Sequence, residues 1–312
     1  MAALRLLFSL GVIAWVVSAG PVSSQRGQEP IRGGDILRSG VDIVTVTATV
    51  LDADGKLATG LPREAFEIYE DGERQTITQF TNERVPVGVG LLLDISDSMF
   101  GQRIVDARTV VDRFLFELLD ESDDSFVLAF NHYPHIITRW TSTPNEVREA
   151  MASLKPSGGT AIYDAVLGAL PMIARRRRER AALVVISDGA DTASDATVGE
   201  VRKSLLRSDA FVYALAIDSP KRQAINTRVN ETALNEITSQ SGGRTEIVRD
   251  IDGLHAATAR IAEELNSQYV MAYASPHATD GKYHSIRVRT TMTGYKVRAR
   301  NGYVGTPKPK SE

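Results

Sequence analysis

The sequence predicts an α/β fold: a doubly wound domain with a mostly parallel central sheet, flanked by a small β-rich module built from the two ends of the chain. Two wholly apolar runs, 85–93 and 181–186, lack polar alternation, which is typical of parallel strands buried on both faces. Segments with helical periodicity follow both runs. Period-two segments recur near the ends, at 41–50 and 268–300.

The first residues predict a secretory signal peptide over 1–20. Arg5 precedes an apolar stretch that ends at Val17, and the small residues behind it suit cleavage near Gly20. An uncleaved membrane anchor is the alternative, although the stretch is short for a span. The polar residues 21–37 predict a flexible leader. We therefore expect a secreted or periplasmic protein without an integral membrane span after cleavage.

Composition agrees with a globular protein outside the cytoplasm. The net charge is -3, with 24% charged and 43% hydrophobic residues, so neither nucleic-acid binding nor disorder is indicated. The chain contains no cysteine. No disulfide can hold the fold, and its stability must come from packed cores.

A small β module is predicted over 38–84. Residues 41–50 alternate in period two, and the segments 66–70 and 75–80 flank a turn that begins at Asp71. Both flanking segments are expected to be single strands.

An α/β domain is predicted over 85–266, because apolar strands and helical segments alternate there. The expected elements after the first strand are a helix behind Gly101, a strand pair at 126–130 and 135–140, a helix at 161–170, the strand at 181–186, helices at 198–206, 232–241 and 254–265, and strands at 210–217 and 245–248.

The last part of the chain returns to period-two strands. Residues 267–305 contain three such segments, separated by Asp-Gly and Thr-Gly turns, and 306–312 form a tail. We expect 267–305 to pair with 38–84 in one β-sandwich-like module.

Polar side chains follow the first apolar strand at alternate positions. Asp94, Ser96 and Ser98 come directly after it, and Gly101 then opens a helical segment. A loop between a parallel strand and a helix lies at the carboxyl edge of the sheet, where such sheets bind ligands. One carboxylate and two hydroxyls at this edge are typical of a divalent-cation site.

Two further segments can complete this site. The run Ser157-Gly158-Gly159-Thr160 precedes a helical segment and offers the hydroxyl of Thr160. The second apolar strand ends in Ser187-Asp188-Gly189, which offers the carboxylate of Asp188. Taken singly, each residue is equally well explained as a helix cap or an Asx turn, whereas the ordered set favours a metal site.

This ordered set resembles the von Willebrand factor type A domain with its metal-ion-dependent adhesion site. The matching positions are Asp94, Ser96, Ser98, Thr160 and Asp188. The resemblance implies a Rossmann-like fold in which the hydroxyls coordinate Mg²⁺ or Mn²⁺, and Ca²⁺ less readily, while the aspartates act directly or through water. Hard oxygen ligands suit Mg²⁺, which keeps several waters.

The ligand set also suggests what the ion does. Three of the five groups are neutral hydroxyls, so the ion keeps positive charge and attracts an Asp or Glu carboxylate of a protein ligand. The sequence therefore predicts a protein-binding site. The alternative is a structural module of an envelope assembly whose metal does not dock a ligand.

Short sequence segments at both ends of the chain resemble the bacterial VWFA-related secreted proteins described mostly from Acidobacteria. These segments are Thr59-Gly60-Leu61, Phe66-Glu67-Ile68-Tyr69-Glu70-Asp71-Gly72, Gln268-Tyr269-Val270 and Lys296-Val297-Arg298-Ala299-Arg300-Asn301-Gly302-Tyr303. The resemblance covers nearly the whole expected mature chain and implies no particular activity.

Other patterns favour ordinary structure. His132 and His135 flank Pro134 in an expected loop with no third metal ligand, and the basic run 175–180 complements the end of a helix. A haloacid-dehalogenase phosphatase would need an aspartate where Ser96 stands, and no hydrolase elbow, Walker A loop or zinc-protease helix occurs. We therefore expect no enzyme, a metal-dependent hydrolase being the least favoured reading.

Overall fold

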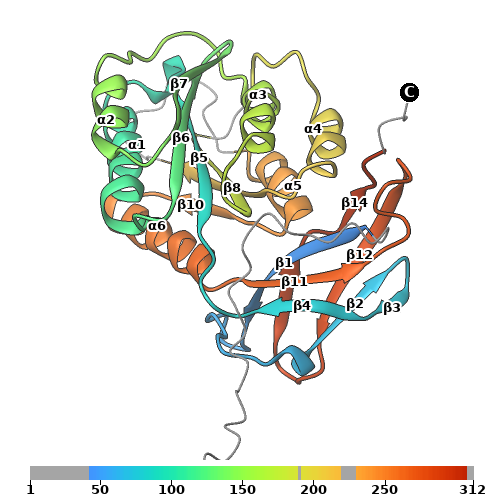
Figure 1. Cartoon of the computed structure of the whole chain (residues 1–312). Coiled ribbons are helices and arrows are strands. Elements are labelled where there is room, and N and C mark those ends of the chain that lie inside the picture. Colours follow the sequence, from blue (N-terminus) through green and yellow to red (C-terminus); the bar gives the residue numbers. More distant parts are fainter. Residues whose placement is uncertain (1–41, 189–190, 219–229, 308–312) are drawn as a thin grey trace, which may run out of the picture. The chain divides into compact units, whose positions relative to one another are not determined.

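The computed structural model describes residues 42–188, 191–218 and 230–307, which form three sheets with helices around the largest (Figure 1). The predicted signal peptide, the leader and the tail beyond residue 307 lie outside the described residues. None of the helices in the described ranges has both the length and the hydrophobicity of a membrane span.

The largest sheet is mostly parallel, as predicted. Its strand order is β10-β9-β8-β5-β6-β7, and only the β6–β7 pair is antiparallel. The strands are β5 (Val87–Asp94), β6 (Asp124–Phe130), β7 (Pro134–Thr141), β8 (Arg180–Ser187), β9 (Phe211–Ile217) and β10 (Thr245–Val248). Every residue of β5, β6, β8 and β9 is buried, which explains why their sequences show no polar alternation.

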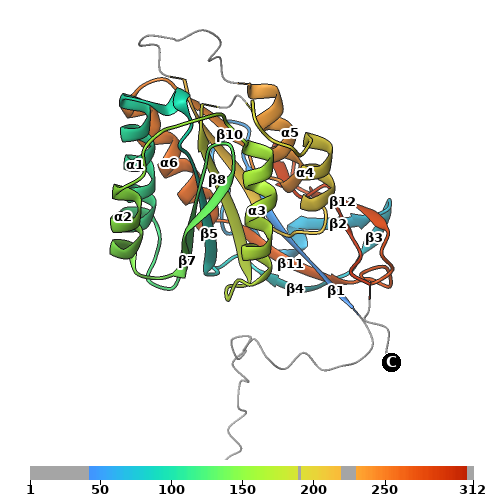
Figure 2. The ribbon, with the colours of Figure 1, turned by 90° about the horizontal axis from the view of Figure 1, so that it is seen from above.

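Helices cover both faces of this sheet (Figure 2). One face packs against α1 (Gln102–Arg113), α2 (Pro144–Ala152) and α6 (Ile251–Asn266), and a short π-helix, Phe114–Leu118, extends α1. The other face packs against α3 (Ile162–Ala174), α4 (Val198–Leu205) and α5 (Glu231–Ser241). Helix α2 was not predicted.

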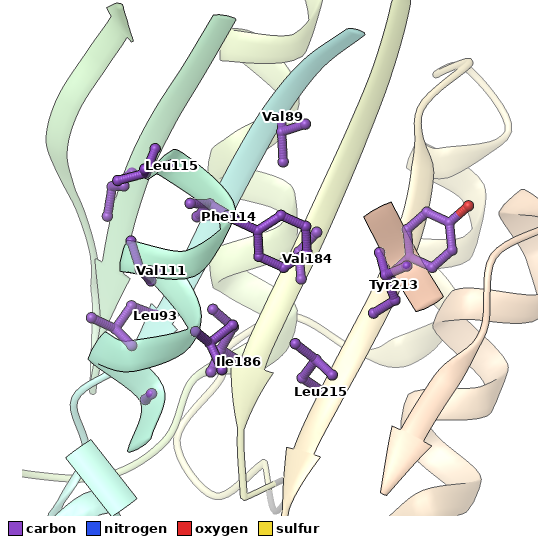
Figure 3. Close-up of a cluster of buried hydrophobic side chains, with 14 of the residues drawn as sticks. Val89, Leu93, Val111, Phe114, Leu115, Val184, Ile186, Tyr213 and Leu215 are labelled. Atoms are coloured by element: carbon purple, nitrogen blue, oxygen red, sulfur yellow. The ribbon is translucent and has the colours of Figure 1, made fainter. Parts of the chain in front are cut away.

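The alternation of side chains along each strand divides the core between the two faces. Val89 and Leu93 of β5 pack with Phe114 on the α1 side (Figure 3), whereas Leu92 packs on the α3 side. Gly90 is required between them, because an added Cβ would lie 2.3 Å from Cζ of Phe126.

Strands from both ends of the chain form the two smaller sheets. One has the order β13-β1-β11-β4 and the other β14-β12-β2-β3, with all pairs antiparallel. Their bounds are β1 (Ile43–Leu51), β2 (Phe66–Glu70), β3 (Glu73–Gln75), β4 (Ile77–Thr81), β11 (Tyr269–Ala274), β12 (Tyr283–Thr290), β13 (Lys296–Ala299) and β14 (Gly302–Val304). Their apolar side chains share a third core. The exact domain boundaries stay predictions.

The prediction of one strand over 75–80 is wrong. Glu73–Gln75 pairs with β2, whereas Ile77–Thr81 joins β11 in the other sheet, so the chain changes sheets at Thr76. Asp71 and Gly72, with φ of 50° and 90°, close the β2–β3 turn tightly. The buried Ile77 then belongs to the shared core, which holds the following strand in the second sheet.

A buried polar network connects α6 with the smaller sheets. Glu264, which is fully buried, accepts hydrogen bonds from Thr49 Oγ1 at 3.2 Å and Tyr213 Oη at 2.8 Å. Its second oxygen pairs with Arg298 and, at 3.3 Å, with Arg244 Nε. One carboxylate thus receives donors from β1, β9 and β13.

Candidate metal site

Asp94 and Asp188 come together because β5 and β8 are parallel neighbours. Leu93 of β5 lies opposite Ile186 of β8, so both strands end at the same level of the sheet edge. Asp94 is the last residue of β5, and Asp188 follows the last residue of β8. Both carboxylates are at least 99% buried, with exposed fractions of 0% and 1%.

Both oxygens of Asp94 accept hydrogen bonds from protein groups. Ser96 N donates to Oδ1 at 2.8 Å, and Ser187 Oγ donates to Oδ2 at 2.5 Å. Burial raises the pKa of Asp94 to about 7, the bonds from Ser187 and Ser96 oppose this rise, and the charge of Asp188 adds to it. Negative charge is therefore unfavourable here, and a cation would compensate it.

Ser96 and Ser98 place two hydroxyl oxygens on one side of the loop after β5. Ser96 is buried and Ser98 half-buried, and their Oγ atoms are hydrogen-bonded to each other at 2.9 Å. Neighbouring ligands of an octahedral Mg²⁺ with bonds of about 2.0–2.1 Å are also separated by about 2.9 Å. The two hydroxyls can therefore coordinate one ion without moving apart.

The loop that carries Thr160 packs directly on the loop after β5. Ser157 N donates to Ile95 O at 2.8 Å, and Asp97 N donates to Gly158 O at 2.9 Å. Gly158 has φ of 81°, and a Cβ there would lie 2.6 Å from the ring of His132. The glycine pair thus permits a close backbone path, on which Thr160 is 4% exposed.

Two residues outside the five candidate ligands hold this loop. His132 Nε2 accepts from Gly159 N at 3.1 Å, so His132 supports the loop rather than pairing with His135. Thr192 Oγ1 accepts from Thr160 N at 3.0 Å, and Thr192 N donates back to Thr160 O at 2.8 Å. The backbone of Thr160 is therefore fixed from two sides.

Arg103 is the main side chain at the candidate site that sequence reasoning missed. Its Nη1 donates to Asp188 Oδ2 and to Ser98 O, both at 3.0 Å, and its side chain is buried. The available signal was a basic residue in the first turn of α1, where the helix dipole disfavours positive charge. Arg103 connects the loop after β5 to the loop after β8.

The five candidate residues thus come from three loops at one sheet edge. Hydrogen bonds link Asp94 to Ser96 and Ser96 to Ser98. Backbone hydrogen bonds hold the loop of Thr160 against the loop after β5. Arg103 donates to both Asp188 and Ser98 and so links these two residues. Gly189 lies outside the described residues. The metal-binding atoms that the five side chains offer are all oxygens, and two of the five groups are buried carboxylates. This set fits a hard divalent cation such as Mg²⁺.

The mostly parallel sheet with helices on both faces is consistent with the fold of a von Willebrand factor type A (VWA) domain. Residues 89–190 match the family described as the von Willebrand factor type A domain, and the chain contains such a domain. Human inter-alpha-trypsin inhibitor heavy chain H3 is 25% identical over 136 residues, which are 40% of this chain and 15% of that protein. The matched region is therefore a small part of that relative.

Two solved structures share the fold. A von Willebrand factor type A protein from Catenulispora acidiphila has a TM-score of 0.52 and 12% identity, over 85% of this chain and 75% of that one. An aerotolerance-related membrane protein from Bacteroides fragilis has a TM-score of 0.50 and 24% identity, over 58% of this chain and 98% of that one. The resemblance to the acidobacterial secreted proteins stays a prediction.

Removing the guanidinium of Arg103 is expected to strengthen metal binding and weaken the metal-free protein. In Arg103→Met, a fixed positive charge leaves the site and Asp188 loses its bond to the guanidinium, so Mg²⁺ affinity should rise about tenfold or more. Breaking the buried pair should lower the metal-free stability by roughly 3–5 kcal/mol. Calorimetric titration and urea unfolding measure both effects. Arg113→Met, at the far end of α1, is the control, and a fall in affinity for Arg103→Met would contradict this account.

Proposed function

We propose that this VWA-domain protein binds a protein ligand through a divalent cation. Asp94, Ser96, Ser98, Thr160 and Asp188 hold Mg²⁺, or Mn²⁺ in its place, and a carboxylate of the partner completes its coordination. The observation that carries the proposal is that two buried carboxylates, those of Asp94 and Asp188, lie at one sheet edge together with the Ser96 and Ser98 hydroxyls.

The charge of the site supports docking. Three neutral hydroxyls accompany two carboxylates, and Arg103 already neutralises part of Asp188. A bound divalent ion therefore keeps positive charge toward solvent. An Asp or Glu side chain of a partner is the natural ligand for it, since ionised acceptors make the stronger contacts.

Two exposed aromatic side chains lie beside the same loops. Phe100, two residues after Ser98, is 78% exposed, and Tyr133, next to His132, is 66% exposed. Partly desolvated aromatic anchors around a polar contact are common in protein interfaces. They favour a protein over a small acid as the ligand. In line with the predicted signal peptide, we expect this interaction to take place outside the cytoplasm.

Metal binding is tested by calorimetric titration of the metal-free protein with Mg²⁺. We expect one equivalent for the wild type and a loss of at least tenfold in affinity for Ser96→Ala, because one ligand is removed. Ser153→Ala, an exposed serine at the end of α2, is the matched control. Equal and negligible uptake by all three proteins would exclude the proposed metal site.

Ligand docking is tested with Mn²⁺ and a defined probe. A short peptide with one aspartate should displace metal-bound water and lower the proton relaxation enhancement of the Mn²⁺-loaded protein. The same peptide with asparagine should not. Metal binding without any response to the aspartate peptide would instead support the alternative, a structural module whose ion only stabilises the fold.

A further inference from the structure

Two imidazoles and a carboxylate converge at the connection between β11 and β12, far along the chain from the VWA sheet edge. His277 and Asp280 belong to this connection, and His284 is the second residue of β12. From these three side chains we propose a second metal site, for Zn²⁺, in the module formed by the smaller sheets. It uses none of the residues of the first site.

The ligand atoms are close enough to share one ion. His284 Nε2 lies 3.1 Å from Asp280 Oδ2, and His277 Nδ1 lies 3.9 Å from the same oxygen. All three ligand atoms lie within 4.8 Å of one another. In a tetrahedral zinc site with bonds of about 2.0–2.1 Å, ligand atoms are about 3.3 Å apart. Shifts of an ångström or so would close the site.

A second carboxylate fixes the ring of His284. Asp71 Oδ2 lies 2.7 Å from His284 Nδ1, and Asp71 Oδ1 is itself held by Ser285 N at 2.8 Å. Metal-binding histidines commonly use their other nitrogen in this way, because it sets the tautomer and the direction of the ring. Here the arrangement directs Nε2 toward Asp280.

Asp280 is likewise oriented. Its Oδ1 accepts from Lys282 N at 2.7 Å, which leaves Oδ2 directed at the two histidines. Further backbone bonds hold the connection: Thr306 N donates to Ala278 O at 2.8 Å and Gly305 N to Lys282 O at 2.9 Å. Hydrogen bonds therefore hold the segment that carries His277 and Asp280 in place.

The ring of His277 lies beside that of His284, with centroids 4.6 Å apart and planes at 16°. A nitrogen of each ring faces the same carboxylate oxygen, Oδ2 of Asp280, at 3.1 Å from His284 and 3.9 Å from His277. The three side chains therefore converge on one point.

The types of ligand atom determine which ion this site prefers. Two imidazole nitrogens and one carboxylate oxygen suit Zn²⁺, whereas Mg²⁺ prefers oxygen ligands. Half of the His277 side chain is exposed, and Asp280 is also partly open. Water can therefore fill the fourth position, and the ion can enter directly. The bound ion is expected to hold the β11–β12 connection against the edge of β12.

The test is Zn²⁺ titration of untagged, full-length protein in competition with a chromogenic chelator, at saturating Mg²⁺. We expect one equivalent for the wild type and at least a tenfold weaker affinity for His277→Ala, whose side chain is exposed enough for the fold to tolerate the change. His255→Ala, an exposed histidine of α6, and Asp94→Asn should bind as the wild type does. Equal uptake by His277→Ala, or none by the wild type, would overturn the proposal.

Co²⁺ provides an independent readout. The wild type should develop the visible absorption of four-coordinate Co²⁺, and His277→Ala should lose it. Asp71→Asn should weaken the affinity about 10- to 100-fold, because it alters only the group that orients His284. A four-coordinate spectrum that persists in His277→Ala would place the ion elsewhere and contradict the assignment.

Discussion

Replacement of Asp94 by asparagine is expected to abolish the stabilisation of the protein by Mg²⁺ while leaving the metal-free protein at least as stable as the wild type. Asp94 is buried, and burial raises its pKa to about 7, so its negative charge is unfavourable without a cation. Asparagine keeps the shape and the acceptor for Ser96 N but carries no charge. The Nδ2 of asparagine takes the place of the oxygen that accepts from Ser187 Oγ, so this bond must reverse its direction. The main loss is the attraction for the metal.

Thermal unfolding with and without Mg²⁺ measures this effect. At a metal concentration of 100 times Kd, binding stabilises the native state by about 2.7 kcal/mol, which corresponds to roughly 5–10 °C in Tm. Asp94→Asn should show almost none of this shift. Asp54→Asn, in an exposed turn after β1, is the control and should shift as the wild type does. A full shift in Asp94→Asn would show that Asp94 does not bind the ion.

Truncation of Glu264 to alanine is expected to be strongly destabilising, with a loss of roughly 3–5 kcal/mol in the free energy of unfolding. Glu264 accepts from Thr49 and Tyr213 and pairs with Arg298 and Arg244. Alanine leaves these donors without their shared acceptor and opens a cavity beside α6. The Mg²⁺ affinity of the site at the sheet edge should stay unchanged, because no residue of that site belongs to the Glu264 network.

Urea unfolding of Glu264→Ala and Glu264→Gln separates charge from shape. Glutamine keeps the size and one acceptor oxygen, so it should lose less stability than alanine. Glu231→Ala, in the first turn of α5, is the exposed control and should stay within about 0.5–1 kcal/mol of the wild type. A loss below about 1 kcal/mol for Glu264→Ala would mean that the network is not essential to the fold.

The elements that sequence reasoning predicted well are those with strong local signals. The apolar runs at 85–93 and 181–186 became β5 and β8 because every residue in these strands is buried, a state that excludes polar alternation. The Asp-x-Ser-x-Ser pattern was visible because its ligands lie within five residues. Their role as metal ligands stays a prediction.

What the sequence could not indicate depends on distant partners. The change of sheet at Thr76 follows from the burial of Ile77 in a core shared with strands about 200 residues later. Arg103 meets Asp188 across 85 residues, and the orientation of His284 depends on Asp71, 213 residues away. Local periodicity contains no information on such contacts.

One divalent ion is proposed to lie between the loops after β5 and β8 and before α3. A crystal structure of the protein grown with Mn²⁺, with data collected at the manganese absorption edge, locates this ion. We expect an anomalous peak within bonding distance of the Ser96 and Ser98 hydroxyls, about 2.0–2.3 Å. Well-ordered loops without a peak at these two hydroxyls, at a Mn²⁺ concentration that gives peaks elsewhere in the crystal, would contradict it.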